Sequence, residues 1–358
     1  AAIVYIPLNI WDFYADAAPM AKNLEVMRQF VLSSKLRQVD GKPDIINDVL
    51  GDWVAPIMVL NDSIRNNTMA PPEGMNLYGT ASHFLVVKQL SEIYKILGKE
   101  KESLEMIEWS KQISERFNQE FYDGKTNTYH GDKPTEYRQS ANVVPLEYGL
   151  VPREKQEAVS RELMKDIHEK NDRLSTGFLG TASLMDCLPE VNPELAYILA
   201  TQRNYPGWGY MVEQGANSMW ESWDGYDSRN HTPFCLISAY FYKFLAGIQI
   251  DMEAPGFKHF IINPSIVGDL TFVNAWHDCL YGRIKSSWKR ENGKLTLVVS
   301  VPVNTTATIY MPAKSVSEVT ESGTPANQAA EVEFLRVANG RAIFKVQSGN
   351  YSFQSIMN

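Results

Sequence analysis

The sequence is poor in cysteine, and its few cysteines show no pattern. Cys187, Cys235 and Cys279 stand far apart among 358 residues. They lack the CxxC or Cys/His spacing of a metal site. We interpret all three as small core residues, because free cysteine is among the most buried residue types. They decide nothing about a disulfide framework or a cellular compartment.

Long apolar runs, basic surfaces and common catalytic motifs are absent as well. No run approaches the roughly 20 apolar residues that cross a bilayer, so no membrane partner is predicted. The net charge is −8, with lysine and arginine scattered among acids, which argues against a nucleic-acid partner. The patterns HExxH, GxGxxG, Walker and GxSxG do not occur. Neither a metal nor an organic cofactor is predicted.

What is present is an ordinary globular composition with a helical first part. Hydrophobic residues make up 44% and charged residues 21%, and the length predicts about two domains. Up to about residue 250, apolar residues recur at spacings of three and four, without a convincing strand. The expected helices cover residues 3–14, 21–36, 78–97, 101–121, 139–148, 153–170, 177–188, 192–202 and 233–245. Gly98 and Gly149 follow two of these as stop signals.

After residue 254 the apolar period changes to two, as in β-strands. The Asn292-Gly293 pair predicts a tight hairpin, and eight short strands suit an antiparallel sandwich. Trp276 and Trp288 fall at alternating strand positions, which favours a place in the core over a carbohydrate-binding platform. The expected strands cover residues 258–263, 270–276, 281–290, 295–301, 306–311, 332–337, 342–346 and 351–356. We predict a helical domain at 1–254 and a β-sandwich at 255–358.

The most unusual segment is YPGWGYMVEQGANSMWESWDGYDSRNH, residues 205–231. It interleaves aromatic residues with four carboxylates, which include Glu213 and Glu221. Burying several unpaired carboxylates in a core would cost several kcal/mol each. A sugar site suits this mixture, because pyranose rings pack on aromatic faces and glycosidic cleavage needs a pair of carboxyl groups. A packed helical face carrying Trp220 and Trp223 explains the spacing equally well.

A second segment repeats the pattern of an acid beside a tryptophan. Asp52 precedes Trp53 in the run GDW, far from residues 205–231 in the sequence. We predict that Asp52 contributes to the sugar site from another loop. A buried tryptophan beside a helix-capping aspartate explains this pair equally well.

Four runs of residues resemble the α-L-rhamnosidases of glycoside hydrolase family 78. They are STGFLGT at 175–181, YPGWGYMVEQGANSMWESWDG at 205–225, SRNH at 228–231 and FYKFLAGI at 241–248, with GDW at 51–53 similar as well. The resemblance implies an (α/α)6 toroid followed by a β-sandwich. It also implies cleavage of terminal α-L-rhamnosyl residues with inversion and without a cofactor, so the expected partner is a rhamnose-containing carbohydrate.

The resemblance assigns roles to individual residues. Glu221, in the run WESW, would be the general base that activates water. Trp53, Trp208 and Trp220 would line the sugar pocket, and His231 would bind a sugar hydroxyl. Apart from the resemblance, we expect Asp224 or Glu213 to adjust the base, and Glu213 to contact the substrate.

One family feature is missing. The general acid of the family lies in an Asp- and Arg-rich segment before the first helix, and no DxxRxER-like run occurs here. We therefore expect an incomplete toroid whose missing N-terminal part belongs to the same polypeptide, with Asp52 or Glu73 as the acid if the chain is active alone. Two rival functions stay open: a rhamnose- or glycan-binding protein without catalysis, and another (α/α)6 exo-glycosidase. The compartment, the oligomeric state and the aglycone are not predicted, although enzymes of this kind are often exported.

Overall fold

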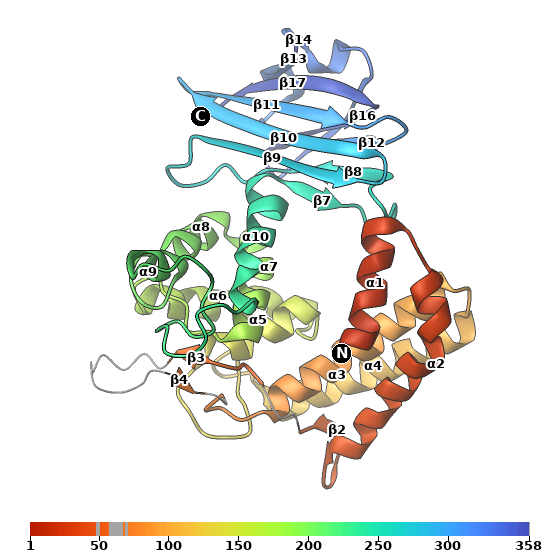
Figure 1. The fold of residues 1–358 in the computed structure, drawn as a ribbon, viewed down its shortest axis with the longest axis vertical. Coiled ribbons are helices and arrows are strands. Elements are labelled where there is room, and N and C mark those ends of the chain that lie inside the picture. Colours follow the sequence, from red (N-terminus) through yellow and green to blue (C-terminus); the bar gives the residue numbers. More distant parts are fainter. Residues whose placement is uncertain (48–50, 57–66, 69–70, 358) are drawn as a thin grey trace. The chain divides into compact units, whose positions relative to one another are not determined.

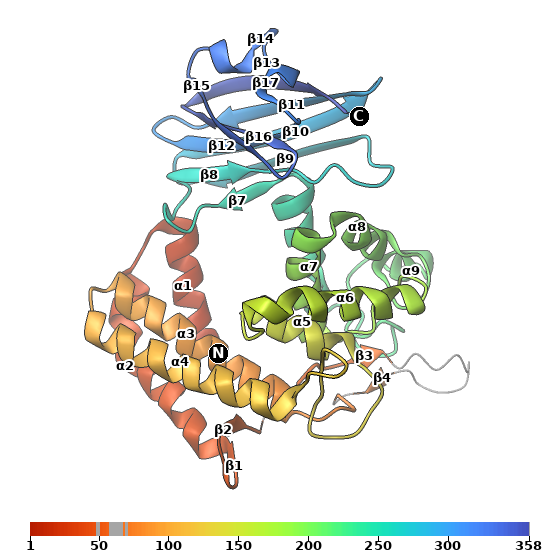
Figure 2. The same ribbon diagram turned by 180° about the vertical axis from the view of Figure 1, so that it is seen from behind.

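The structure is a computed structural model that describes residues 1–47, 51–56, 67–68 and 71–357 (Figures 1 and 2). The chain forms two compact units. The first contains residues 1–8 and 18–237, and the second contains residues 9–17 and 238–358. This division precedes residue 254, because residues 238–254 pack with the second unit. A division by contacts does not test the predicted domain boundary at 254, which stays a prediction.

The first unit is mainly helical, as the apolar period of three and four predicted. In the described residues, α3 packs along α4, and α5 packs against both α6 and α7 (Figure 1). Helix α1 begins in this unit and ends in the second. The helices are α1 (Ala2–Tyr14), α2 (Ala18–Ser33), α3 (Asn76–Ile96), α4 (Glu100–Phe121), α5 (Gln139–Tyr148), α6 (Arg153–Glu169), α7 (Phe178–Val191), α8 (Pro193–Thr201) and α9 (Trp208–Glu213).

The helix ends follow from local chemistry. Gly98 and Gly149 adopt φ values of 71° and 79° after α3 and α5, a left-handed conformation that glycine adopts without a steric penalty. Asn192 caps α8 by accepting the Leu195 amide at 3.1 Å, and Pro193 occupies the first turn. The two predicted glycine stop signals are therefore confirmed.

Two predictions for residues 1–250 are wrong in detail. Short strand pairs occur in the connections between the helices. The sequence did not predict them, because strands of two to five residues are too short to show a period of two. They are β1 (Gln38–Val39) with β2 (Lys42–Ile46), β3 (Ala55–Pro56) with β4 (Asn67–Thr68), and β5 (Tyr122–Asp123) with β6 (Thr128–Tyr129). The single helix expected at 233–245 is instead a 3-10 turn (Pro233–Leu236), α10 (Ile237–Tyr240) and a π-helical turn (Phe241–Leu245).

The second unit contains two sheets that pack face to face. The six-stranded sheet has the order β14-β13-β17-β11-β10-β9, and the five-stranded sheet has the order β15-β16-β12-β8-β7. The strands are β7 (Ile248–Ile250), β8 (His259–Ile262), β9 (Phe272–Cys279), β10 (Gly282–Glu291), β11 (Lys294–Val301), β12 (Thr306–Pro312), β13 (Val319–Glu321), β14 (Thr324–Pro325), β15 (Val332–Ala338), β16 (Arg341–Val346) and β17 (Gly349–Ile356).

The sandwich is not wholly antiparallel. Strand β8 pairs with β12 in parallel, which is possible because β9, β10 and β11 lie between them in the sequence and provide the long crossover that parallel neighbours need. The hairpin at Asn292-Gly293 is confirmed: it joins β10 to β11, with φ values of 51° and 72°, as a type I′ turn requires.

The core of the second unit lies between the sheets. Phe344 and Phe353, one from each sheet, meet with ring centroids 5.5 Å apart. Trp288 is 2% exposed and belongs to this core, as predicted, but Trp276 is 47% exposed, so its predicted core position is wrong. Trp276 and Trp288 are an even number of strand residues apart, yet the register pairs Trp276 with Lys285 and Trp288 with Val273, which places their side chains on opposite faces.

The cysteines also depart from the prediction. Cys187 and Cys279 are half-buried and Cys235 is exposed, and all three are free. A cysteine is short enough to stand at the margin of an apolar segment without reaching its core. Apolar sequence neighbours were therefore a poor guide to the burial of these three thiols.

Candidate active site

The candidate site is carried by the loop that follows α9. Two backbone hydrogen bonds cross-link this loop: the Glu221 amide donates to the Ser228 carbonyl at 2.7 Å, and the His231 amide donates to the Met219 carbonyl at 2.9 Å. The Ser228 amide donates in return to the Glu221 Oε2 at 3.3 Å. Glu221 is half-buried. Its carboxylate is thus held by its own loop while part of the side chain stays open to solvent.

Trp223 attaches the loop to the segment before α7. Its indole N–H donates to the Thr176 carbonyl at 3.0 Å, and its ring stacks on Phe234 with centroids 3.9 Å apart. Trp208 meets Trp223 edge to face at 5.2 Å and donates its indole N–H to the Phe234 carbonyl at 3.0 Å. Both indoles are buried, so they support the loop by packing and by hydrogen bonds.

Trp220 packs within the same loop. It is 3% exposed, and the Arg229 guanidinium lies over its ring, 5.1 Å from the centroid. Gly225 has a φ of 68° and approaches the ring so closely that a Cβ there would lie 2.5 Å from it. The alternative of a packed helical face for Trp220 and Trp223 is therefore half right: both are buried, but residues 220–223 form no helix.

Phe178, the first residue of α7, contacts two segments that the sequence placed in the site. The His231 ring stacks on the Phe178 ring at 5.4 Å with an angle of 19°. The Phe178 amide donates to the Trp53 carbonyl at 2.9 Å. Trp53 and His231 are both half-buried, and the His231 Nδ1 is buried without a hydrogen-bond partner in the described residues. The structure thus brings Trp53 and His231 to the same end of α7.

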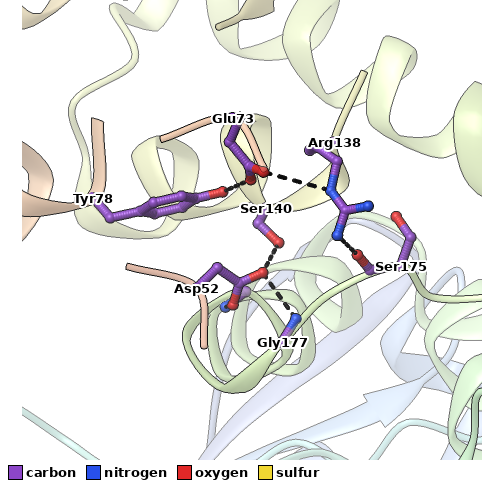
Figure 3. A network of polar contacts seen from close by, with 8 residues as sticks. Asp52, Glu73, Tyr78, Arg138, Ser140, Ser175 and Gly177 are labelled. Carbon is purple, nitrogen blue, oxygen red and sulfur yellow. Dashed lines mark hydrogen bonds and ion pairs between the residues drawn. The ribbon is translucent and has the colours of Figure 1, made fainter. Parts of the chain in front are cut away.

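Asp52 lies inside the protein and contacts the same end of α7 (Figure 3). Its carboxylate accepts the amides of Gly177 and Gly180, both at 2.8 Å, and the hydroxyl of Ser140. Negative charge at a helix N-terminus is stabilised by the unpaired amides and the helix dipole. Asp52 therefore caps a helix, as the alternative expected, although that helix lies far away in the sequence; Trp53 is half-buried and not buried. With no exposed surface, Asp52 is placed to hold α7 rather than to touch a sugar in this structure.

A second buried carboxylate lies beside it (Figure 3). Glu73 accepts the Tyr78 hydroxyl, and its Oε2 is 3.7 Å from the Arg138 Nε. Arg138 also donates to the Ser175 carbonyl at 2.9 Å. The Glu73 Oε2 and the Arg138 Nε are buried without a hydrogen-bond partner in the described residues. The pair is thus held by charge at a distance slightly too long for a direct hydrogen bond.

Burial raises the pKa values of the Asp52 and Glu73 carboxyls, against the opposing charge of Arg138. An acid whose folded pKa is raised contributes most stability below its unfolded pKa, near 4, and that contribution falls as the pH rises through the folded pKa. We expect the free energy of unfolding of the wild type, relative to Glu73→Gln, to decline as the pH rises above about 4. Urea denaturation followed by helical circular dichroism measures this difference. A difference that grows with pH contradicts the expectation.

Glu213 lies apart from this arrangement. It is exposed at the end of α9 and forms an ion pair with Arg203 at 2.5 Å. An exposed ion pair contributes about 0 to 1 kcal/mol, so this contact alone does not fix its position. The predicted role of Glu213 in substrate binding stays a prediction.

Cavities also lie elsewhere among the described residues of the first unit. One, of about 600 Å³, lies between α3 and α4, and one, of about 330 Å³, lies beside α2 and α3. Neither is lined by a predicted site residue. Among the described residues, no group of three or more His, Cys, Asp and Glu side chains is arranged to hold a metal ion, and no helix is long and apolar enough to span a membrane.

Sequence comparison places the chain among known proteins. The family model for the bacterial α-L-rhamnosidase 6 hairpin glycosidase domain matches residues 1–245. The chain belongs to this family. The model for the bacterial α-L-rhamnosidase C-terminal domain matches residues 247–326.

Several α-L-rhamnosidases are similar to the chain. One from Streptomyces avermitilis is 34% identical over 227 residues, or 60% of this chain and 21% of the relative. One from Formosa agariphila is 27% identical over 373 residues, or 98% of this chain and 38% of the relative. The crystal structure of the S. avermitilis enzyme complexed with L-rhamnose matches with a TM-score of 0.84 at 26% identity, over 99% of this chain and 32% of that chain.

A second solved structure is also similar to the chain. The structure of an α-L-rhamnosidase from Dictyoglumus thermophilum matches with a TM-score of 0.87 at 27% identity, over 99% of this chain and 39% of that chain. The chain thus spans about a fifth to two fifths of the length of these α-L-rhamnosidases. The predicted fold class, an (α/α)6 toroid followed by a β-sandwich, and the resemblance to the rhamnosidases are confirmed.

Some residues that build the site escaped sequence reasoning. Arg138, Ser140, Phe178 and Phe234 received no role, although each contacts a predicted site residue or its loop. The run STGFLGT contained a usable signal, because Gly177 and Gly180 are three residues apart at the start of an expected helix. That spacing indicates a helix end that another segment approaches closely.

Proposed function

We propose that the protein containing this chain hydrolyses terminal α-L-rhamnosyl residues of glycans or glycosides with inversion of configuration. Membership of the bacterial α-L-rhamnosidase family supports this activity. The observation that carries the proposal is the Glu221 loop: a partly exposed carboxylate, held by the Ser228 amide, among tryptophans and next to His231. Aromatic and acidic groups in one loop are what a pyranose substrate requires.

In this proposal Glu221 is the general base. It takes a proton from the water that attacks the anomeric carbon on the face opposite the leaving oxygen, while a carboxylic acid protonates that oxygen. Inverting enzymes keep the two carboxyl groups about 6.5 to 9.5 Å apart to leave room for the water. The hydrogen bond from Ser228 at 3.3 Å uses one of the carboxylate oxygens, so the carboxylate is oriented and retains acceptor capacity for that water.

The neighbouring residues contribute binding. In the proposal, Trp53 contacts a sugar ring and His231 binds one of its hydroxyls, which is supported by the half-buried state of both residues and by their contacts with Phe178. Trp208 and Trp220 are more buried, so we assign them to the rigid support of the pocket. Asp52 acts through α7.

The rival function is rhamnose or glycan binding without catalysis. It is favoured by the absence of a DxxRxER-like run and by the burial of the two candidate acids, Asp52 and Glu73. If the protein hydrolyses rhamnosides, we propose that its general acid lies outside the residues described here. In that case the general acid and Glu221, the proposed base, come from different segments of the polypeptide.

The test is release of para-nitrophenol from para-nitrophenyl α-L-rhamnoside, by the 358-residue chain and by the longest natural polypeptide that contains it. We expect turnover by the longer protein, with β-L-rhamnose as the first product anomer in proton NMR spectra. Retained α configuration contradicts the inverting mechanism. Saturable rhamnose binding without turnover by either protein supports the rival. Turnover by the short chain means that one of its own carboxyls is the acid.

A further inference from the structure

The Asp52 carboxylate is the most constrained charged group near α7. It has no exposed surface, and its three donors come from positions 88 to 128 residues away in the sequence. Burying an ionised carboxylate is costly unless hydrogen bonds compensate. The compensation is arranged around the N-terminus of α7, since both amide donors belong to Gly177 and Gly180 (Figure 3).

The same helix end also fits closely against Trp53 and against Ser140 of α5. A Cβ on Gly177 would lie 2.2 Å from the Trp53 carbonyl oxygen, and a Cβ on Gly180 would lie 2.2 Å from the Ser140 hydroxyl. These approaches are too close for any side chain. The position of α7 is therefore tied to residues 52–53 by hydrogen bonds and by direct backbone contact.

The first turn of α7 then contacts the loop of the proposed general base at two points. On one side, the Thr176 carbonyl accepts the indole N–H of Trp223, two residues after Glu221. On the other, the Phe178 ring stacks on His231 and meets Phe234 edge to face at 5.2 Å. Thr176 and Phe178, at the start of α7, thus contact the Glu221 loop at Trp223 and at His231.

Arg138 provides a second attachment beside the first. It faces the buried Glu73 at 3.7 Å. It also donates to the carbonyl of Ser175, the residue before Thr176, whose carbonyl accepts the Trp223 indole. Arg138 secures the chain just before α7, while Asp52 secures the helix amides themselves. Loss of Asp52 therefore leaves the segment attached but frees the first turn of α7.

We infer that Asp52 is a positioning residue, which sets the orientation of Glu221 through the first turn of α7, Trp223 and His231. The expected effect on kcat rests on the proposed role of Glu221, whereas the expected effect on the position of Trp223 does not. Misplacing a reacting group by about 1 Å costs up to about 100-fold in rate. Asp52 touches neither the substrate nor the reacting atoms.

The structural test reads the indole of Trp223 directly. In the chain labelled with ¹⁵N-tryptophan, Trp223→Phe assigns the Trp223 resonance among those of the eight tryptophans. We expect Asp52→Asn, which keeps the size of the side chain, to accelerate hydrogen exchange of that indole by about 10-fold or more. Exchange at the Trp288 indole, which belongs to the second unit, should be unchanged. Unchanged exchange at Trp223 in a folded Asp52→Asn chain overturns the inference.

The kinetic test uses the active protein and separates kcat from KM. We expect Asp52→Asn to lower kcat by about 10- to 100-fold with KM within about 3-fold, at a temperature where circular dichroism shows the variant folded. Asp44→Asn is the matched control: it makes the same change at a buried carboxylate of the first unit that pairs with Trp109 and Arg116 of α4 rather than with α7, so kcat should stay within about 3-fold of wild type. A purely structural role changes the melting temperature in both variants and kcat in neither, which overturns the inference.

A second variant covers the case in which Asp52→Asn does not fold. Trp223→Phe removes the indole N–H that the Thr176 carbonyl accepts, together with part of the buried ring, and keeps an aromatic ring against Phe234. It should lower kcat about 10-fold with little change in KM, and wild-type kcat in this variant overturns the inference. Glu221→Gln is measured in parallel. If that variant is fully active, the proposed base is wrong, and the Trp223 exchange measurement still decides the role of Asp52.

Discussion

Replacing Glu221 by glutamine should abolish most turnover of the active protein while leaving rhamnose binding nearly intact. Glutamine has almost the same shape and can still accept the Ser228 amide that now bonds to the Glu221 Oε2. It cannot take a proton from water. General-base assistance is commonly worth 10²- to 10⁴-fold, so we expect kcat to fall by about that factor. Initial rates on para-nitrophenyl α-L-rhamnoside, with KM measured alongside, check this prediction.

Two further measurements sharpen that result. Glu108→Gln, which changes an exposed acid on α4, is the control and should have wild-type rates. Glu221→Ala with added azide should regain part of the rate and release β-L-rhamnosyl azide, because azide attacks without losing a proton. Near-normal turnover by Glu221→Gln, or an α-configured azide product, contradicts the assignment of Glu221 as the base.

Replacing Trp288 by alanine should destabilise the second unit more than any surface change in it. Trp288 is 2% exposed and lies in the core between the sheets, and its indole N–H donates to the Leu245 carbonyl at 2.8 Å. Truncation of a buried aromatic residue typically costs about 3 to 5 kcal/mol. We expect a loss of this size in the free energy of unfolding of the second unit, measured by chemical denaturation followed by β-sheet circular dichroism.

The same unit contains a matched control for this change. Trp276→Ala removes an equally large side chain that is 47% exposed, with the Arg283 guanidinium over its ring at 5.3 Å. It should cost about 0.5 to 1 kcal/mol. Trp288→Phe should lie between the two, because it loses one hydrogen bond and part of the buried ring but keeps an aromatic side chain in the core. Equal losses for the two alanine variants contradict the assignment of Trp288 to the core.

Local patterns predicted the secondary structure where a segment was long. The 22 residues of α4 bury Ser110, Ile113, Phe117 and Phe121 on one face, which is the spacing of three and four that the sequence shows. The alternation in β11 is equally direct, since its burial changes at every residue. The strand pairs β1–β2, β3–β4 and β5–β6 were missed because they are too short to carry such a period.

The candidate site was predicted in part. Residue types singled out the loop of Glu221, because it mixes acids with aromatics beyond what a core tolerates, and the resemblance to the rhamnosidases selected Glu221 within it. Composition could not tell which tryptophans would be buried. Trp220 and Trp223 are both almost fully buried, the first under Arg229 and the second against Phe234, and these contacts depend on how the loop folds back on itself.

By itself, the sequence determined the two kinds of secondary structure, the family, and the loop that carries the proposed base, since each is encoded within short segments. Only the tertiary structure decided where Asp52 lies and which groups it contacts. Its amide partner Gly177 lies 125 residues away, and no local period records a hydrogen bond over that separation. The Asp52 carboxylate is buried at a helix N-terminus, where unpaired amides compensate the loss of its water.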